Sequence, residues 1–457
     1  MLFNQASASA PLQRIQPDLP SFIKLFAVPT QFCNFEMKNQ YMKKLSILSL
    51  FVITGLISFA QTARITPAAE RVNVYVPLLK NKRVGVFSNQ TSLVGKNHLI
   101  DTLKSLGINI TVIFSPEHGF RGTADAGEKV GNMKDPKTGI EVISLYGASR
   151  KPKAEDLAKA DVLLFDVQDV GVRFYTYISS LQEFMEAAFE NGKPLMILDR
   201  PNPNGHYVDG PVLEAPFKSF VGMQPVPIVY GMTIAEYGMM IAGEGWLSKI
   251  ANEKFAYYKN AENSKDTPFH FQIIKNANYT HKSLYELPVK PSPNIPNIQS
   301  IYLYPSTCFF EGTVLSEGRG TNKQFQIFGH PSLPKTLVKF TPKSMEGAKT
   351  PKLQDKVCYG WDLSGTKEEV FNKVNNKVQL KWLMEAYKLF PVKDSFWLKP
   401  KSGKEEDYFF NKLAGNSTLR KQINEGVSET DIRKSWEPAL SKFKAIRKKY
   451  LLYEDFE

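Results

Sequence analysis

The sequence predicts an α/β protein: a Rossmann-like parallel-sheet domain followed by a smaller α+β auxiliary domain. Short apolar runs alternate with segments of helical periodicity between residues 83 and 198, which is typical of a parallel sheet covered by helices on both faces. The chain has 457 residues, more than one ordinary domain holds, so two domains are expected. From about Asn263 the chain becomes richer in Lys, Asn and Pro. The expected domains are therefore 65–262 and 263–457.

Residues 1–64 are expected to lie outside both domains. Two lysines precede an apolar run that ends in Ser58-Phe59-Ala60, so Met42–Ala60 has the charged region, apolar region and cleavage site of a secretory signal peptide. The alternative is a transmembrane anchor, but the run is short for a span of ~20 residues. We expect an exported protein, periplasmic or extracellular, without a stable membrane anchor. Residues 1–41 are interpreted as an extension upstream of the true start at Met42.

Five strands and three helices are predicted in the first part of the sheet domain. The strands are 83–88, 108–114, 141–145, 161–165 and 194–198, and the helices are 99–106, 154–160 and 178–190. The parallel topology brings the carboxyl ends of the strands to one edge of the sheet, where open α/β sheets bind ligands. Polar residues follow every strand and should converge there: Asn89, Glu117, His118, Asp166, Gln168, Asp169, Arg173, Asp199, Arg200 and Asn202.

The loop after the second strand carries the densest chemistry. Pro116 ends the strand because it cannot donate to a sheet ladder, and Glu117, His118 and Arg121 follow within a few residues, spaced by glycines. Glycine permits the close approach of a ligand to the backbone. The alternative is a solvated loop with a capping acid.

The remaining elements are predicted from shorter signals. Thr233 and Glu236 have the spacing of a capping box, which is a structural role for that glutamate. In the auxiliary domain, strands are expected at 269–274, 337–340 and 357–361, and helices at 378–389, 418–425 and 436–448. Cys308 and Cys358 follow the cleavage site and could pair in an oxidising compartment, but two cysteines make no disulfide framework.

The carboxylates at the sheet edge suggest glycoside chemistry. Asp166 and Asp169 stand three residues apart just after a strand, and with Glu117 they supply the pair of acids that glycosidases use, one to protonate the leaving oxygen and one as base or nucleophile. The structural alternatives are a helix N-cap for Asp169 or a salt bridge to Arg173 or Arg200. Arginines suited to a carboxylate stand beside glycine-bearing turns, which suggests an anionic substrate unless they merely neutralise the aspartates: Arg121, Arg173, Arg200 and Arg319.

Several other functions are disfavoured. The first strand is followed by Ser-Asn-Gln-Thr-Ser and not by the glycine fingerprint of dinucleotide-binding enzymes. A Walker loop, a G-x-S-x-G elbow and an H-x-x-x-H pair are all absent. A metal site built from Asp166, Asp169 and Asp199 is the weaker alternative. The net charge of +13 favours anionic partners, but export and the lack of a binding motif argue against nucleic acid.

Five motifs in order resemble those of the YbbC/NamZ-type exo-β-N-acetylmuramidases. The motifs are Ser-Asn-Gln-Thr (88–91), Pro-Glu-His-Gly-Phe-Arg-Gly (116–122), Asp-Val-Gln-Asp-Val-Gly-Val-Arg-Phe-Tyr-Thr-Tyr (166–177), Leu-Asp-Arg-Pro-Asn-Pro (198–203) and Glu-Gly-Arg-Gly-Thr (317–321). The resemblance runs from about residue 70 to the C-terminus. It implies a secreted glycoside hydrolase that removes N-acetylmuramic acid from the non-reducing ends of peptidoglycan fragments in cell-wall turnover, with a Rossmann-like catalytic domain and an auxiliary domain. We expect no cofactor and no metal.

The resemblance also implies roles for individual residues. Glu117 would be the principal catalytic carboxylate, Asp166 or Asp169 the partner acid or an orienting group, Tyr175 a nucleophile or charge stabiliser, and His118 a supporting group. Arg121, Arg173 and Arg319 would hold the lactyl and N-acetyl groups. The other expected substrate-binding residues are Asn89, Gln90, Gln168, Asp199, Arg200, Asn202, Glu317 and Thr321. The competing interpretation is a non-catalytic, two-lobed muropeptide-binding protein.

Overall fold

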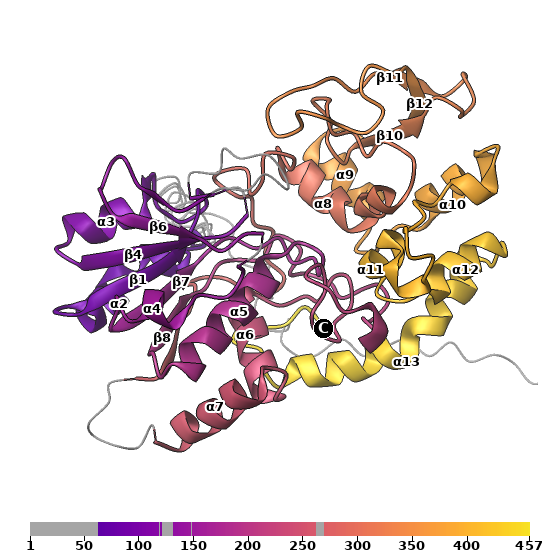
Figure 1. Cartoon of the computed structure of the whole chain (residues 1–457). Coiled ribbons are helices and arrows are strands. Elements are labelled where there is room, and N and C mark those ends of the chain that lie inside the picture. The colour runs from indigo at the N-terminus through magenta and orange to yellow at the C-terminus, as the bar shows by residue number, and fades with distance from the viewer. Residues whose placement is uncertain (1–62, 118, 121–130, 148, 262–268) are drawn as a thin grey trace, which may run out of the picture. The chain divides into compact units, whose positions relative to one another are not determined.

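The computed structural model describes residues 63–457 except 118, 121–130, 148 and 262–268 (Figure 1). The expected extension and signal peptide lie outside the described residues, as do the candidates His118 and Arg121. Among the helices that the structure describes, none is both long and apolar enough to cross a membrane.

A seven-stranded sheet forms the core of the N-terminal part, in the order β5-β6-β4-β1-β7-β8-β9. All neighbouring strands are parallel except β5 and β6. The parallel strands follow one another in the spatial order 3-2-1-4-5-6, that of a doubly wound Rossmann sheet, so the predicted fold class is confirmed. The strands are β1 (Arg83–Ser88), β4 (Asn109–Ser115), β5 (Met133–Lys134), β6 (Glu141–Ser144), β7 (Val162–Asp166), β8 (Leu195–Leu198) and β9 (Phe271–Ile274).

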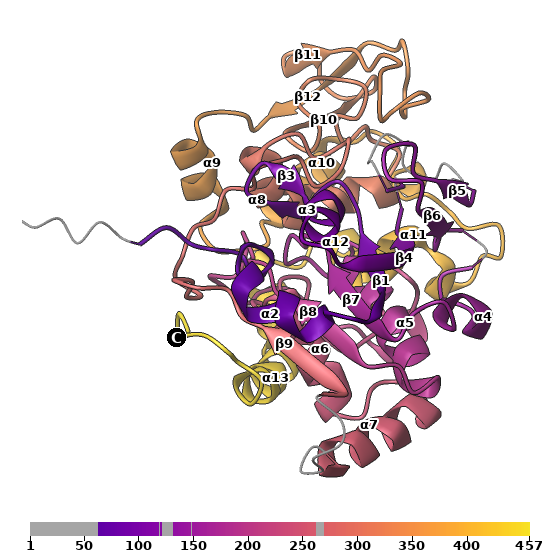
Figure 2. The same ribbon diagram turned by 90° about the vertical axis from the view of Figure 1, so that its left-hand side faces the viewer.

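Helices cover both faces of this sheet (Figure 2). Successive side chains of a strand point to opposite faces, and β1 shows the consequence. Val84 and Val86 belong to a core shared with α2 (Val72–Leu79) and α3 (Leu99–Ser105). Phe87 belongs to the core on the other face, with the remaining helices of this part. These helices are α4 (Ala154–Leu157), α5 (Tyr177–Glu190), α6 (Ile234–Gly243) and α7 (Lys249–Ala261).

The last strand of the sheet lies beyond the expected domain boundary. β9 pairs in parallel with β8, for example Leu195 with Phe271 and Leu198 with Ile274. The sheet domain therefore reaches past the boundary expected between residues 262 and 263. The change in composition begins before the last strand of the sheet, so composition by itself places the boundary too early.

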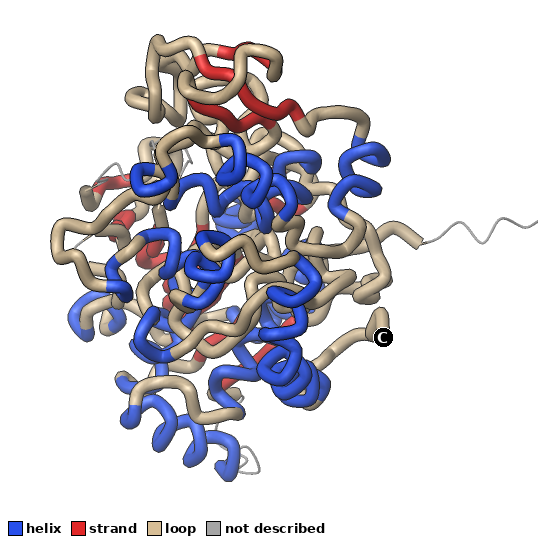
Figure 3. The backbone as a smooth tube through the Cα atoms, turned by 90° about the vertical axis from the view of Figure 1, so that its right-hand side faces the viewer, coloured by secondary structure: helices blue, strands red, loops and turns tan. Residues whose placement is uncertain are grey.

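The C-terminal part combines a small sheet with a group of helices (Figure 3). The sheet is antiparallel, in the order β10-β12-β11. Cys308 and Cys358 are both buried free thiols. The helices and strands of the C-terminal part are α8 (Ile298–Thr307), β10 (Ile327–His330), β11 (Val338–Phe340), β12 (Cys358–Asp362), α9 (Lys367–Val374), α10 (Lys381–Leu389), α11 (Phe409–Ala414), α12 (Thr418–Asn424) and α13 (Glu429–Lys448). The other elements among the described residues are short: η1 (Ala68–Glu70), β2 (Leu93–Val94), β3 (Asn97–His98), η2 (Ala215–Phe217), η3 (Cys308–Gly312), η4 (Lys393–Ser395) and η5 (Glu405–Asp407).

After α13 the chain returns to the sheet domain. The Leu452 amide donates to Glu236 Oε1 over 2.7 Å, and the Tyr453 hydroxyl donates to Asp199 Oδ2 over 2.5 Å. Glu236 also closes the predicted capping box with Thr233 at the start of α6, so its structural interpretation is confirmed. These two hydrogen bonds hold the C-terminal segment against α6 and the end of β8.

Candidate active site

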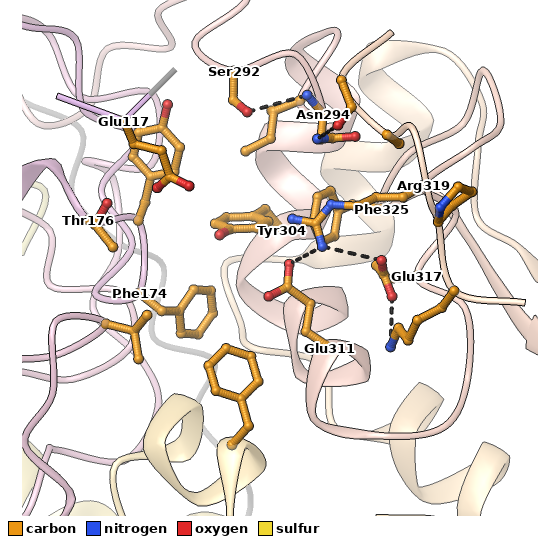
Figure 4. A pocket seen from close by; sticks show the side chains of 18 of the residues that line it. Glu117, Phe174, Thr176, Ser292, Asn294, Tyr304, Glu311, Glu317, Arg319 and Phe325 are labelled. Carbon is orange, nitrogen blue, oxygen red and sulfur yellow. Dashed lines mark hydrogen bonds and ion pairs between the residues drawn. The ribbon is translucent and has the colours of Figure 1, made fainter. Parts of the chain in front are cut away.

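A cavity of about 530 Å³ lies at the carboxyl ends of β4 and β6. One wall comes from the loops after these strands and from the start of α5, and it carries Glu117 and Thr176. The facing wall comes from the C-terminal part and carries Tyr304, Glu311, Glu317 and Arg319 (Figure 4). Side chains separated by about 200 residues thus share one cavity.

Glu117 occupies this cavity because only Pro116 separates it from the end of β4. The strand stops at Ser115, and a turn follows in which the Gly119 amide donates to the Pro116 carbonyl over 3.1 Å. Gly119 has φ of +74°, a conformation that favours glycine. The Glu117 side chain is partly exposed and lines the cavity. The predicted position of this carboxylate at the edge of the sheet is confirmed.

Two tyrosines stand at the start of α5 beside Glu117. The Tyr175 hydroxyl donates to the Pro291 carbonyl over 2.8 Å, and the Tyr177 hydroxyl accepts from Asn89 Nδ2 over 2.7 Å. Burial raises the pKa of both phenols, and the nearby Glu117 carboxylate adds to the rise at Tyr177. Both hydroxyls are therefore protonated at neutral pH. They can donate to a substrate or orient it, but a tyrosinate nucleophile is disfavoured.

The facing wall contains a compact group of four charges. Arg319 Nη1 lies 2.7 Å from Glu311 Oε1 and 3.3 Å from Glu317 Oε1, and Lys352 Nζ lies 2.8 Å from Glu317 Oε2. Burial opposes the charge of Arg319, but the two glutamates outweigh it and raise the pKa of the guanidinium. Burial raises the pKa of Glu311, whereas at Glu317 it is outweighed by Lys352 and Arg319, which lower the pKa. Arg319 is thus neutralised by protein carboxylates.

The three aspartates of the predicted site have internal partners and do not line the cavity. Asp166 forms a buried ion pair with Arg200, with 2.6 Å between Oδ1 and Nε, which is one of the structural alternatives. Asp169 accepts from the Gly171 amide over 2.6 Å and from the Tyr230 hydroxyl. Asp199 accepts from Tyr453 and from backbone and amide donors around it.

Burial also shifts the pKa of two of these aspartates. It raises the pKa of Asp169 and that of Asp199 to about 7 each. The assignment of Asp166 or Asp169 as the partner acid of Glu117 is not supported, because a carboxylate enclosed by protein donors cannot reach a glycosidic bond. Among the described residues, no three His, Cys, Asp or Glu side chains are grouped to hold a metal ion, so the three aspartates form no metal site.

Arg173 has a structural environment as well. Its guanidinium is fully buried and donates to the carbonyl oxygens of Pro211, Val226 and Leu413 over 2.7–2.8 Å. Burial without a carboxylate partner lowers the pKa of Arg173 to about 9. The side chain ties loops of the sheet domain to the end of α11, and it is not available to a substrate.

The remaining predicted binding residues are mostly bonded to the backbone. Gln168 Nε2 donates to the Pro201 carbonyl, and Asn202 Nδ2 donates to that of Met232, both over 2.7 Å. Gln90 Nε2 donates to the Pro291 carbonyl, and the Thr321 hydroxyl to that of Gly318. Of the predicted residues that the structure describes, those that line the cavity are Glu117, Tyr175, Glu317 and Arg319.

Several cavity residues have weak signals in the sequence. Thr176 and Tyr177 belong to the 166–177 motif, and Glu311 stands six residues before Glu317, but none of these three positions marks a cavity by itself. Tyr146 and Arg150 follow the third predicted strand, at the same edge of the sheet as Glu117. Their sequence signal is the one that marks Glu117, because polar residues after a parallel strand lie at the ligand-binding edge of the sheet.

Fold and site together define a class of protein. A doubly wound sheet and a second α+β part enclose a cavity lined by carboxylates and aromatic rings. Such a lining is typical of proteins that bind and cleave glycosides. The family models for the N-terminal and C-terminal domains of the exo-β-N-acetylmuramidase NamZ match residues 84–299 and 302–453. The chain belongs to this family.

Known relatives match most of the chain. The peptidoglycan β-N-acetylmuramidase NamZ of Bacillus subtilis (strain 168) is 38% identical over 397 residues, which are 83% of this chain and 89% of that protein. Two crystal structures of DUF1343 family proteins from Bacteroides fragilis NCTC 9343 have TM-scores of 0.74 and 0.67 at 42% and 27% identity. Each covers 86% of this chain, and the matches include 100% and 99% of those chains.

Proposed function

We propose that this protein is an exo-acting β-N-acetylmuramidase that releases N-acetylmuramic acid from the non-reducing ends of peptidoglycan fragments. The observation that carries the proposal is the position of Glu117, which enters the cavity from the carboxyl end of β4 in a chain of the NamZ family. Peptidoglycan fragments are accordingly its proposed partners, and cell-wall turnover is its proposed role.

Glu117 is the proposed catalytic carboxylate. Glycoside cleavage requires carboxyl groups in defined roles. One donates a proton to the leaving oxygen, and another attacks the anomeric carbon or activates a water molecule that attacks it. Among the described residues, the carboxylates that line the cavity are Glu117, Glu311 and Glu317. The last two share Arg319, whereas Glu117 comes from the sheet edge. Tyr175 and Tyr177 act as neutral hydrogen-bond donors beside it.

The candidates for the second catalytic acid are the other two carboxylates of the cavity, Glu311 and Glu317. Glu317 is nearly fully buried and held ionised by Lys352 and Arg319, which suits a structural anion. The Glu311 side chain is 16% exposed, against 2% for Glu317, and burial raises its pKa, so Glu311 is the proposed partner acid.

Glu117→Gln tests the proposal. With 4-nitrophenyl β-N-acetylmuraminide as substrate, we expect kcat to fall by about 10³-fold, the range typical of lost acid–base catalysis. Glu253→Gln, at an exposed position of α7, is the control and should keep wild-type kcat. Wild-type activity in Glu117→Gln would remove this residue from the mechanism.

Calorimetry on the same proteins separates the enzyme from the non-catalytic alternative. An enzyme releases N-acetylmuramic acid from muropeptides over the course of the titration. Tight binding of a muropeptide by the wild type with no released sugar after hours would favour the binding protein.

The proposed site of action is outside the cytoplasm. The signal-peptide pattern in Met42–Ala60 and the peptidoglycan substrate of the Bacillus subtilis relative support export. N-terminal sequencing of the mature protein from cell fractions is expected to find Gln61 as its first residue, in a periplasmic or extracellular fraction. An intact N-terminus in the cytoplasmic fraction would contradict export.

A further inference from the structure

The wall of the candidate active site contains a cation that has no ionic partner among the residues that the structure describes. Arg150 follows β6, the strand next to β4 in the sheet, so it belongs to the same sheet edge as Glu117. Both residues line the 530 Å³ cavity. The Arg150 side chain is exposed, and its position was not among those expected to contact a substrate.

Arg150 is held in place by a ring and not by a charge. Its guanidinium carbon lies 3.9 Å from the centre of the Phe220 ring. Phe220 sits in a tight turn closed by two backbone hydrogen bonds between Ser219 and Gly222, and its carbonyl accepts from the Ser179 hydroxyl of α5 over 2.8 Å. The ring is therefore a fixed platform for the guanidinium.

Stacking leaves the donors of the guanidinium available. A guanidinium on a ring uses its face, while its N–H groups point outward in its own plane, where they can bind a carboxylate in bidentate fashion. Within the described residues, Arg150 forms no hydrogen bond or ion pair. The charge of Arg150 counteracts part of the rise in the pKa of Glu183, but the two side chains are too far apart to form an ion pair.

The other cations of the cavity are occupied. Arg319 is paired with Glu311 and Glu317, and Lys352 with Glu317 and two backbone carbonyls. Lys349 also has an interaction partner. Glu117, Glu311 and Glu317 all line the cavity. An anionic sugar that binds there therefore needs a nearby positive charge to offset their repulsion.

We propose that Arg150 binds the lactyl carboxylate of the N-acetylmuramic acid residue and so selects this sugar over N-acetylglucosamine. The inference rests on the proposed function and names the residue that decides its specificity. The lactyl group is the chemical difference between the two sugars, and a stacked, unpaired guanidinium matches its carboxylate. Arg150 binds this group without contacting the glycosidic bond, so it acts on substrate recognition.

Two substrates that differ only in this charge test the proposal: 4-nitrophenyl β-N-acetylmuraminide and its lactyl methyl ester. For the wild type, kcat/KM should be higher for the free acid. In Arg150→Gln the ratio should fall by about 10- to 100-fold, as expected when a hydrogen-bonded charge pair is lost. The activity on the ester should stay close to wild type. Arg150→Lys keeps the charge but not the fork, so its ratio should be intermediate.

The matched control is Lys218→Gln. Lys218 is an exposed cation just before the turn that holds Phe220, and it lines a neighbouring cavity and not this one. Its ratio should equal that of the wild type, which excludes a general effect of net charge. An unchanged ratio in Arg150→Gln, or an equal fall in Lys218→Gln, would overturn the inference. If the wild type released nothing from either substrate, the proposed function itself would fail.

Discussion

The arginines of the predicted site differ in their partners, and the partners decide what each side chain can do. Arg200 is paired with Asp166, Arg319 with Glu311 and Glu317, and Arg173 with three carbonyl groups. A buried guanidinium whose terminal N–H groups bind protein carboxylates or carbonyls stabilises the fold. One stacked on a ring keeps its donors for a ligand.

Arg173→Met separates these two roles. The change leaves carbonyl oxygens buried without a donor, so we expect the free energy of unfolding to fall by about 3 kcal/mol. KM for the muraminide should stay within about twofold of wild type, because the side chain does not reach the cavity. Urea denaturation and initial-rate kinetics measure the two quantities. In Arg150→Gln the pattern should be reversed, with an unfolding free energy within about 0.5 kcal/mol of wild type, as for a surface residue.

At the scale of elements, β1 shows how tightly the sheet is packed against its helices. Gly85 stands in the central strand, and a Cβ at this position would lie 2.9 Å from Leu163 Cδ2 and 3.1 Å from Ala160 Cβ. Leu163 is in β7 and Ala160 lies in the connection between α4 and β7, so the glycine lets this connection approach the sheet. A glycine inside a strand often marks such a close approach.

Gly85→Ala is therefore expected to lower the free energy of unfolding by about 1–3 kcal/mol, the usual cost of overpacking a core. Thermal and urea denaturation measure the loss. Gly131→Ala is the control, because nothing lies within 4 Å of the added Cβ there, and its stability should equal that of wild type. Equal stability of the two variants would mean that the Leu163 side chain moves aside without cost.

At the scale of the whole molecule, the C-terminal segment connects the end of the chain to the sheet domain. Tyr453 donates to Asp199 at the end of β8, and Asp455 pairs with Arg447 of α13. Burial raises the pKa of Asp199 from its ordinary value of 3.8 to about 7, and the Tyr453 hydrogen bond counteracts part of this rise. The stability associated with Asp199 is therefore fully present below about pH 4 and is lost as pH rises through 7.

Tyr453→Phe should accordingly destabilise the protein more at pH 8 than at pH 5. At pH 8 the ionised carboxylate loses a donor, and we expect a loss of about 2 kcal/mol in the free energy of unfolding. At pH 5 Asp199 is protonated in the folded state, so the loss should be smaller. Tyr450→Phe removes a similar bond, to Glu244, whose pKa is lowered. That glutamate is ionised at both pH values, so its effect should not vary with pH. The same variation in both variants would disprove the role of Asp199.

The sequence by itself determined the alternation of strands and helices, the capping box at Thr233 and the place of Glu117 after a buried strand. These follow from local patterns: apolar runs, cap spacing and a proline that ends a strand. The motifs also sufficed to identify the family. Only the tertiary structure decided which polar side chains face the cavity, because that depends on neighbours distant in the chain. Asp166 is occupied by Arg200 of an adjacent strand end, Arg173 by carbonyls that no local pattern reveals, and Arg150 is left available because a ring from a distant turn holds it.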